Sequence, residues 1–222
     1  MTKKQTAGNA PGRTRLDPAT VAAAALELLA EKGVDAVSVR AVADRLGVRM
    51  NTVLWHVKTK AGLLELMADA IVAGMALEGL PDPWDERVRE LAVRYRRALL
   101  AHRDGAAVVA GTYAAEPATL RGAEAFVAAL RAGGLPEREA LWACFTLVYY
   151  VLGLTQEEQA SRTADTPRLT RALASGAYPE LSRCAPYLTE SSFDERFAYG
   201  LELILRSLRA SGAAPATSSR AG

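Results

Sequence analysis

The stretch from Gly33 to Leu64, GVDAVSVRAVADRLGVRMNTVLWHVKTKAGLL, constrains the fold more than any other part of the chain. Ser38 is a suitable N-cap for a short helix, because its hydroxyl can accept a hydrogen bond from an unpaired first-turn N–H. Gly47 follows where that helix should stop and the backbone turn through positive φ, and a second short helix is expected over about 49–56. A helix, a glycine turn and a second helix form the arrangement that lays its second helix in the major groove of DNA. The apolar residues of the first helix recur at the three- and four-residue steps of one helix face: Val39, Val42 and Leu46.

Charge is unevenly distributed along the 222 residues, although the net charge is only +2. Residues 1–60 hold ten Lys/Arg and five Asp/Glu, whereas residues 61–222 hold the remaining 17 and 20. A basic front end favours contact with phosphate groups. A solvated basic tail explains the charge equally well, because part of it lies in the polar N-terminus. The four cations in that segment are Lys3, Lys4, Arg13 and Arg15.

Composition excludes several classes of protein. Half of the residues are hydrophobic, with Ala and Leu dominant and Gly and Pro mostly between apolar-periodic segments, so we expect an all-α protein with a large core. Cys144 and Cys184 lack the spacing of a metal site and the chain has only two histidines, so we expect no metal and no cofactor. Scarce cysteines, no signal peptide and no apolar run of ~18 residues predict a cytoplasmic protein without a membrane partner.

The periodicity of the remaining segments predicts a series of helices. Asp17-Pro18 supplies an N-cap and a first-turn proline, and the run from Gly133 to Pro136 (GGLP) is the clearest break in the second part of the chain. The helix expected over 136–159 is apolar nearly all round, so more than one of its sides must be buried. We expect helices over 17–32, 60–79, 84–102, 117–132, 136–159 and 192–210, a short segment over 106–113, a weaker helix over 168–174, and irregular or short-helical structure over 176–187.

The run TVLWHVKTKAGLL, from Thr52 to Leu64, resembles the signature of the TetR family of one-component repressors. The likeness begins at Val21, is nearest to the tetracycline-repressor subgroup, and covers about residues 17–209. It implies a helix-turn-helix head and a helical body. The domains are then a disordered basic arm at 1–16, a DNA-binding domain at 17–62, a ligand-binding and dimerisation domain at 63–210, and a disordered tail at 211–222. Looser matches in the body follow in the family's order: 96–100, 103–105, 111–112, 152–153, Glu157, Gln159 and 200–202.

The resemblance also implies which residues meet DNA. Arg40 stands where relatives read guanine, and a guanidinium fork bidentate to guanine is the commonest specific contact. The residues expected to read bases are Arg40, Arg49, Met50, Asn51 and Thr52. Among them, Asn51 could pair with adenine, and the Thr52 methyl could pack on a thymine methyl. His56, Lys58 and Lys60 are expected on phosphates, which fix register without reading sequence. The full expected DNA surface is Ser38, Arg40, Arg49, Met50, Asn51, Thr52, Leu54, Trp55, His56, Lys58 and Lys60.

Several of these residues have simpler interpretations. Trp55 is expected mainly to pack in the core of the head, His56 could be a structural histidine, and the two lysines could be solvated. Relatives carry Gln-Pro in place of Met50-Asn51 and an aromatic residue in place of Leu54, so we expect an operator different from that of tetracycline repressors.

An effector pocket is implied between the helices that start at 84, 117 and 136. Its lining suits a small, largely apolar or aromatic ligand. The alternative is that these aromatic residues are simply core. The metal-ligating histidine of the tetracycline repressors falls on Val109, and two drug-contacting positions fall on Ala76 and Leu91, so magnesium-bound tetracycline is a poor candidate. The expected lining is Met75, Leu91, Tyr95, Val109, Thr112, Phe126, Phe145, Tyr149, Tyr150 and Glu157.

The helices over 136–159 and 192–210 are expected to form a homodimer, as in the family, so that two heads meet one palindromic operator on double-stranded DNA. The helix over 60–79 would be one continuous rod from head to body. We predict a repressor released by a small-molecule effector. The alternative is a DNA-binding regulator without such an effector, controlled by a protein partner or acting as an activator. No nucleophile elbow, phosphate loop or dinucleotide motif supports an enzyme.

Overall fold

The computed structural model describes residues 16–112, 115–161, 166–190 and 192–212, and within these ranges the chain is helical and contains no β-strand. The predicted fold class, all-α with a three-helix head and a helical body, is confirmed. The predicted arm at 1–16 and tail at 211–222 lie almost entirely outside the described residues. Leu16 packs against the core, and the last helix extends to Gly212. No helix in the described ranges has the length and apolarity needed to cross a membrane.

The head consists of α1 (Pro18–Lys32), the 3₁₀ turn η1 (Val34–Ala36), α2 (Val39–Leu46) and α3 (Met50–Val57). Its helix ends follow the predicted signals. The Asp17 carboxylate accepts from Thr20 N at 2.7 Å, and Ser38 Oγ accepts from Ala41 N at 3.1 Å. Gly47 ends α2 in the left-handed region at φ 65°. The apolar faces of the helices meet in a core that includes Val21, Leu29, Val42, Val53 and Leu63.

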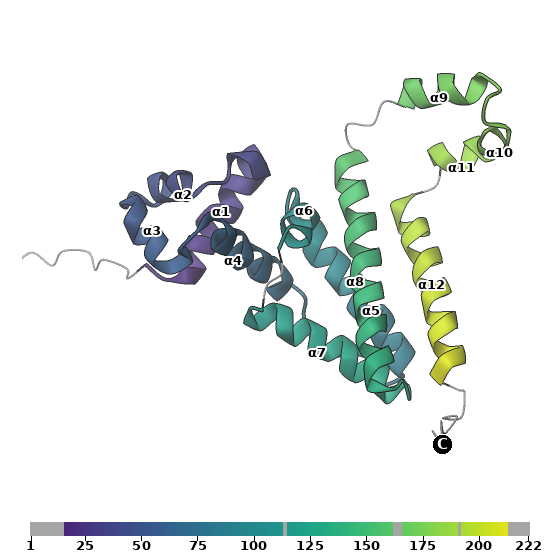
Figure 1. The fold of residues 1–222 in the computed structure, drawn as a ribbon, viewed down its shortest axis with the longest axis horizontal. Coiled ribbons are helices and arrows are strands. Elements are labelled where there is room, and N and C mark those ends of the chain that lie inside the picture. Colours follow the sequence, from purple (N-terminus) through teal and green to yellow (C-terminus); the bar gives the residue numbers. More distant parts are fainter. Residues whose placement is uncertain (1–15, 113–114, 162–165, 191, 213–222) are drawn as a thin grey trace, which may run out of the picture.

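Helix α4 (Lys60–Ala73) leaves the head and enters the body (Figure 1). The expected rod over 60–79 is therefore wrong, because the helix stops at Gly74. The backbone carbonyls beyond it are held by a residue of the next helix. The Arg94 guanidinium donates to Ala76 O at 2.8 Å, Glu78 O at 2.6 Å and Gly79 O at 3.4 Å. These carbonyls have a tertiary partner, so the chain can turn there instead of continuing as a helix.

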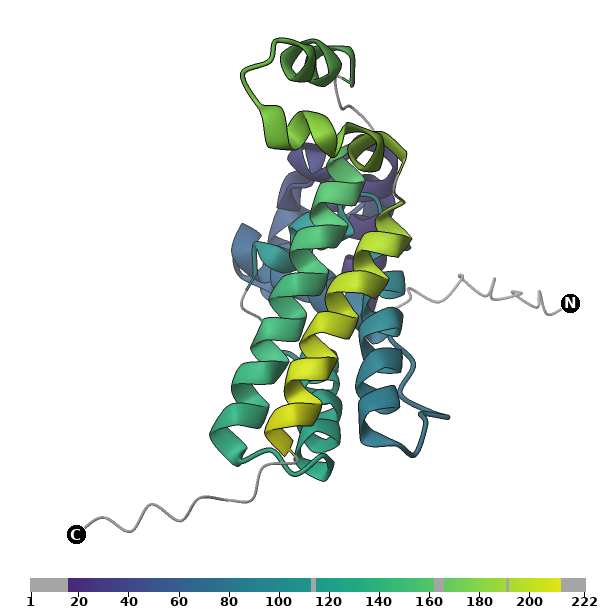
Figure 2. The same ribbon diagram turned by 90° about the vertical axis from the view of Figure 1, so that its right-hand side faces the viewer.

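The body is a bundle in which α4, α5, α6, α7 and α8 pack around a common interior. Helices α8 and α12 run antiparallel and side by side on its outer face (Figures 1 and 2). Three short helices, α9–α11, extend beyond the end of α8 (Figure 1). The bounds are α5 Trp84–Leu100, α6 Gly105–Ala110, α7 Pro117–Ala132, α8 Glu137–Ala160, α9 Thr166–Ala174, α10 Pro179–Arg183, α11 Ala185–Glu190 and α12 Phe193–Gly212.

Side-chain hydrogen bonds link helices of the body to one another, and one links the body to the head. The Gln159 amide of α8 donates to Leu99 O at 3.2 Å and His102 O at 2.8 Å, and its oxygen accepts from Ala106 N at 3.1 Å. Gln159 thus holds the turn between α5 and α6. Asp104, in that turn, accepts from Val34 N of the head at 3.2 Å. The turn is therefore fixed to both α8 and the head.

Helices α8 and α12 touch most closely at Tyr150 and Gly200. The Tyr150 hydroxyl donates to Arg196 O at 2.8 Å and Phe197 O at 3.0 Å, and its ring stacks on Phe197 at a centroid distance of 6.1 Å. A Cβ added at Gly200 would stand 2.3 Å from the Tyr150 oxygen. Only glycine allows this approach, because any side chain would displace the ring.

We expect Gly200→Ala to destabilise the protein by about 1–3 kcal/mol, the usual cost of overpacking a well-filled contact. Chemical denaturation of the full chain measures it. Gly153→Ala is the matched control, because Gly153 is also helical and a Cβ there meets nothing within 4 Å. The control should be neutral or slightly stabilising. Equal losses in the two variants would show that the Tyr150 contact is not the cause.

Candidate functional site

One face of the head carries most of the residues expected to meet DNA. On this face Ser38, Leu54 and His56 are half-buried, and the other expected residues are exposed. The apolar side of α3 faces inward through Val53 and Val57, which are 0% and 6% exposed. The opposite side of α3 is therefore exposed, and it could enter a groove of DNA. The exposed residues are Arg40, Arg49, Met50, Asn51, Thr52, Trp55, Lys58 and Lys60.

Trp55 is not a core residue. Its side chain is 75% exposed, and its ring meets the His56 ring edge-on at a centroid distance of 4.8 Å. The expectation of core packing is wrong because Val53 and Val57, spaced one turn apart, occupy the inward face and leave Trp55 on the other side. A large exposed indole beside cationic residues is a feature of a contact surface.

The turn after α3 places two lysines at the edge of this face. Lys58 has φ 61°, a conformation that favours glycine, and its N–H donates to Leu54 O at 2.8 Å to close the helix. Backbone strain of this kind concentrates at functional positions and costs about 1–3 kcal/mol. Thr59 then caps α4 by accepting from Gly62 N at 3.0 Å, so that Lys60 opens the next helix.

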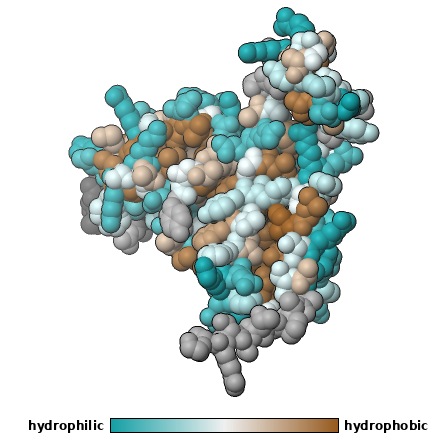
Figure 3. Space-filling view, turned by 45° about the vertical axis from the view of Figure 1, so that its right-hand side comes forward, coloured by the Kyte–Doolittle hydropathy of each residue, from teal (hydrophilic) through white to brown (hydrophobic). Residues whose placement is uncertain are grey.

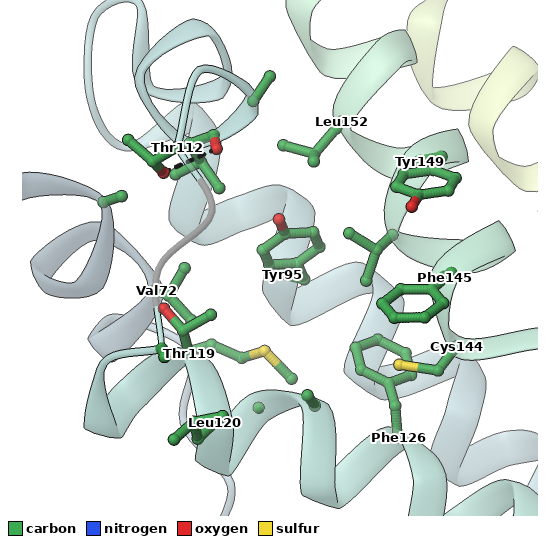
Figure 4. Close-up of a pocket in the computed structure, with 18 of the residues that line it drawn as sticks. Val72, Tyr95, Thr112, Thr119, Leu120, Phe126, Cys144, Phe145, Tyr149 and Leu152 are labelled. Carbon is green, nitrogen blue, oxygen red and sulfur yellow. Dashed lines mark hydrogen bonds between the residues drawn. The ribbon is translucent and has the colours of Figure 1, made fainter. Parts of the chain in front are cut away.

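A cavity of about 650 Å³ lies inside the body, within the range of small-molecule sites. It is bounded by the end of α4 and by α5, α6, α7 and α8 (Figure 4). Several lining residues are themselves exposed and mark its opening, and the large apolar ones among them are Leu120, Leu141 and Tyr149. Figure 3 shows further apolar side chains at the surface of the body. Seven of the ten expected residues line the cavity: Met75, Tyr95, Val109, Thr112, Phe126, Phe145 and Tyr149.

The other three expected residues lie outside the cavity. Leu91 is fully buried in the core. Tyr150 points to α12, as described above. Glu157 is exposed, and its carboxylate lies 3.9 Å from the Arg196 guanidinium. Tyr149 and Tyr150 are neighbours on one helix and so project about 100° apart, which sends them to different surfaces.

Sequence reasoning missed most of the aliphatic and small residues of the cavity wall. They resemble ordinary core residues, so composition does not single them out. A usable signal is the one-face stripe on α8, where lining residues recur at three- and four-residue steps. The residues of this stripe are Leu141, Cys144, Phe145, Val148, Tyr149 and Leu152.

The cavity wall is almost entirely apolar and carries no Asp, Glu, Lys, Arg or His side chain among the described residues. The Thr112 hydroxyl donates to Val109 O at 3.0 Å. Burial raises the pKa of the Cys144 thiol to about 11, and it raises the pKa of Tyr95 well above its ordinary value. Both groups are therefore neutral at physiological pH, and the site holds no charge.

The residues that surround the cavity do not fit a divalent cation. Such ions take carboxylate, carbonyl and water oxygens, or imidazole. The wall offers Val109 and other apolar groups instead, and within the described ranges no group of three His, Cys, Asp or Glu could hold a metal.

A pair of hydrogen bonds joins the cavity wall to α4. Asp69 Oδ1 of α4 accepts from Thr119 N at 2.8 Å and from Thr119 Oγ1 at 3.1 Å. Thr119 lines the cavity and lies in the first turn of α7, whose own N-cap residue Glu116 makes no side-chain bond. Asp69 thus caps α7 from another helix. A ligand bound beside Thr119 would therefore contact a residue that is hydrogen-bonded directly to α4, the helix that connects the head to the body.

A helix-turn-helix head on a helical body with an apolar cavity is the architecture of a one-component transcriptional regulator. Comparison with known families agrees. Residues 21–67 match the family "Bacterial regulatory proteins, tetR family", and residues 79–211 match "Tetracyclin repressor-like, C-terminal domain". Together these matches show that the chain belongs to the TetR family. It is a TetR-family transcriptional regulator.

Individual relatives cover nearly the whole chain. The class G tetracycline repressor protein of Vibrio anguillarum is 34% identical over 199 residues, which span 86% of this chain and 93% of the relative. A possible TetR family regulator from Streptomyces coelicolor A3(2) is 38% identical, with a TM-score of 0.77 over 87% of this chain and 99% of that one. ActR of Streptomyces coelicolor, solved with actinorhodin, is 27% identical, with a TM-score of 0.79 over 90% and 99%.

Proposed function

We propose that this protein is a repressor that binds a palindromic operator as a homodimer and is released by an uncharged, largely apolar effector. The observation that carries the proposal is the apolar cavity in the body, joined through α4 to the exposed face of the head. Relatives with the same architecture are a tetracycline repressor and a regulator solved with actinorhodin. The cavity favours this function over a regulator without a small-molecule effector.

The homodimer is supported by the outer face of the body. Trp142 of α8 is 54% exposed, and Tyr199 and Leu203 of α12 are 69% and 48% exposed. Large apolar residues on two adjacent helices indicate a surface that another protein covers. A second copy of the chain, paired about a two-fold axis, would bury this face and supply the second head that a palindrome needs.

The effector is proposed to differ from magnesium-bound tetracycline. An ion and a polar drug need oxygen or nitrogen ligands, and the wall offers Val109 and other apolar groups instead. Release would follow from a change in α4, because Asp69 ties it to Thr119 of the cavity wall. An effector shifts the operator-binding equilibrium only by the difference between its affinities for the operator-binding and the released arrangement of α4. A coupling free energy of about 1–3 kcal/mol between two such sites is usual.

The operator-binding half of the proposal is tested by selecting duplexes from a random pool with the full-length protein. Arg40→Ala should weaken binding to the selected operator by about 1–3 kcal/mol and relax one base position in each half-site. Lys60→Ala should weaken binding to all sequences alike, because a phosphate contact carries no base information. A selected sequence without two-fold symmetry would contradict the homodimer. Relaxed specificity in Lys60→Ala with unchanged specificity in Arg40→Ala would reverse the two roles.

A further inference from the structure

The hydroxyl of Tyr95 is a polar group inside the cavity that has no partner among the residues the structure describes. Tyr95 lies on α5, is 6% exposed and lines the cavity. Its hydroxyl forms no hydrogen bond within the part of the chain that the structure describes. Figure 4 shows the oxygen pointing into the space between Thr112, Leu152 and Tyr149. The hydroxyl opens onto the cavity, so its partner is a molecule that enters the cavity, either water or a ligand.

The other hydroxyls of the wall differ from Tyr95. Thr112 Oγ1 donates to Val109 O, and Thr119 Oγ1 donates to Asp69 Oδ1, so both of their protons are in use. Tyr149 is 64% exposed and lies at the opening, where water can solvate it. The thiol of Cys144 is buried, and a thiol is a weak donor. The Gln156 amide also lines the cavity, but Gln156 is exposed at the surface. Among the described residues, Tyr95 is therefore the strong donor that remains available in the buried part of the wall.

We propose that Tyr95 determines effector specificity by donating a hydrogen bond to an acceptor oxygen, such as a ketone or quinone carbonyl, on an uncharged and flat effector. The inference rests on the proposed function, since it assigns the chemistry of the molecule that the body cavity would bind. No charged side chain lines the described part of the wall, so a charged ligand would be buried there without a counter-ion. The burial of Tyr95 raises its pKa, which keeps the proton available for donation.

The shape of the wall supports a flat ligand. Phe145 and Tyr149 lie one turn apart on α8 with their rings 8° from parallel and 6.0 Å between centroids. Phe126 of α7 projects toward the same side of the cavity (Figure 4). Aromatic side chains favour offset or edge contacts with another unsaturated ring. The Tyr95 oxygen stands apart from these rings, so one molecule can contact the rings with its face and Tyr95 with its carbonyl.

Discrimination should come from the cost of leaving the phenol unpaired. A ligand that fills the cavity but carries no acceptor atom displaces the water that is hydrogen-bonded to the Tyr95 hydroxyl. The hydroxyl then has no hydrogen-bond partner at all. An unsatisfied buried donor costs roughly as much as a tenfold change in affinity, and up to a hundredfold. A ligand that carries a carbonyl at that point avoids this loss. Removing the hydroxyl should remove the preference and leave apolar binding intact.

The test uses fluorenone and fluorene, which differ only by a carbonyl in place of a methylene group. Dissociation constants for the full-length protein are measured by calorimetry and corrected for the partition of each probe between water and octanol. The wild type should bind fluorenone about tenfold more tightly than fluorene on this scale. Tyr95→Phe should abolish the preference by weakening fluorenone alone. Tyr178→Phe, which removes an exposed phenol outside the cavity wall, should keep it.

A second measurement separates a hydrogen bond from packing. The carbonyl stretch of bound fluorenone should shift to lower frequency in the wild type and return toward its apolar-solvent value in Tyr95→Phe. Equal binding of the two probes by the wild type, or equal losses of both in Tyr95→Phe, would overturn the role of Tyr95 and leave the apolar effector cavity in place. Failure of both probes to bind the wild type up to their solubility limits would overturn the cavity as an effector site, and the Tyr95 proposal with it.

Discussion

Operator binding should fall by about 10³-fold when the salt concentration rises from 50 to 200 mM. Each head presents three exposed cations beside α3, namely Arg49, Lys58 and Lys60, so a dimer presents six. The logarithm of the binding constant falls with the logarithm of salt at about 0.9 per phosphate neutralised, which gives a slope near −5. Titrations of the selected operator at several salt concentrations measure it. A slope near zero would exclude the proposed phosphate contacts.

Replacing two of these cations tests their position. The double variant Lys58→Gln with Lys60→Gln removes about four charges from the dimer interface and should reduce the slope by about 3.6. Lys32→Gln is the matched control, because Lys32 is exposed at the far end of α1, next to the turn that contacts the body. Its slope should equal that of the wild type. Equal reductions in both variants would mean that general charge attraction, and not the α3 edge, sets the salt dependence.

Val109→Trp should abolish the response to the effector while the protein stays folded and dimeric. Val109 is half-buried on α6 and faces the cavity, where the larger indole would occupy the space that the effector needs. We expect at least a hundredfold loss of effector affinity, because overlap with a filled site cannot relax in a close-packed interior. Operator binding in the presence and absence of effector measures the response, and a thermal melt checks folding.

A size series at the same residue makes the result interpretable. Val109→Ala enlarges the cavity and should keep the response, with a modest loss of effector affinity. If Val109→Trp binds the operator poorly even without effector, the indole imitates the effector; if it binds well, the indole only blocks the site. An unchanged response to the effector in Val109→Trp would show that Val109 does not line the effector site.

Local signals were enough to predict the head. Ser38 and Gly47 act on the backbone within four residues of themselves, and the apolar stripe of α2 repeats within two turns. Such signals do not depend on the rest of the fold, so the sequence predicts the helix-turn-helix with its boundaries. Periodicity also predicted the series of body helices, and the resemblance to the TetR family added the expected cavity and dimer surface. Seven of the ten residues expected in the cavity wall do line it, because residues one or two turns apart on the same helix face the same space.

Contacts between distant residues decided the rest. The end of α4 depends on Arg94, which lies more than fifteen residues beyond the carbonyls it binds at Ala76 and Glu78. The direction of Tyr150 depends on α12, about fifty residues away, since periodicity alone cannot tell which face of an apolar helix meets which neighbour. Whether the Tyr95 hydroxyl has a hydrogen-bond partner depends on all the helices that pack around it. Hydrogen-bond partners and empty space are properties of assembled helices, and no single segment of the chain contains them.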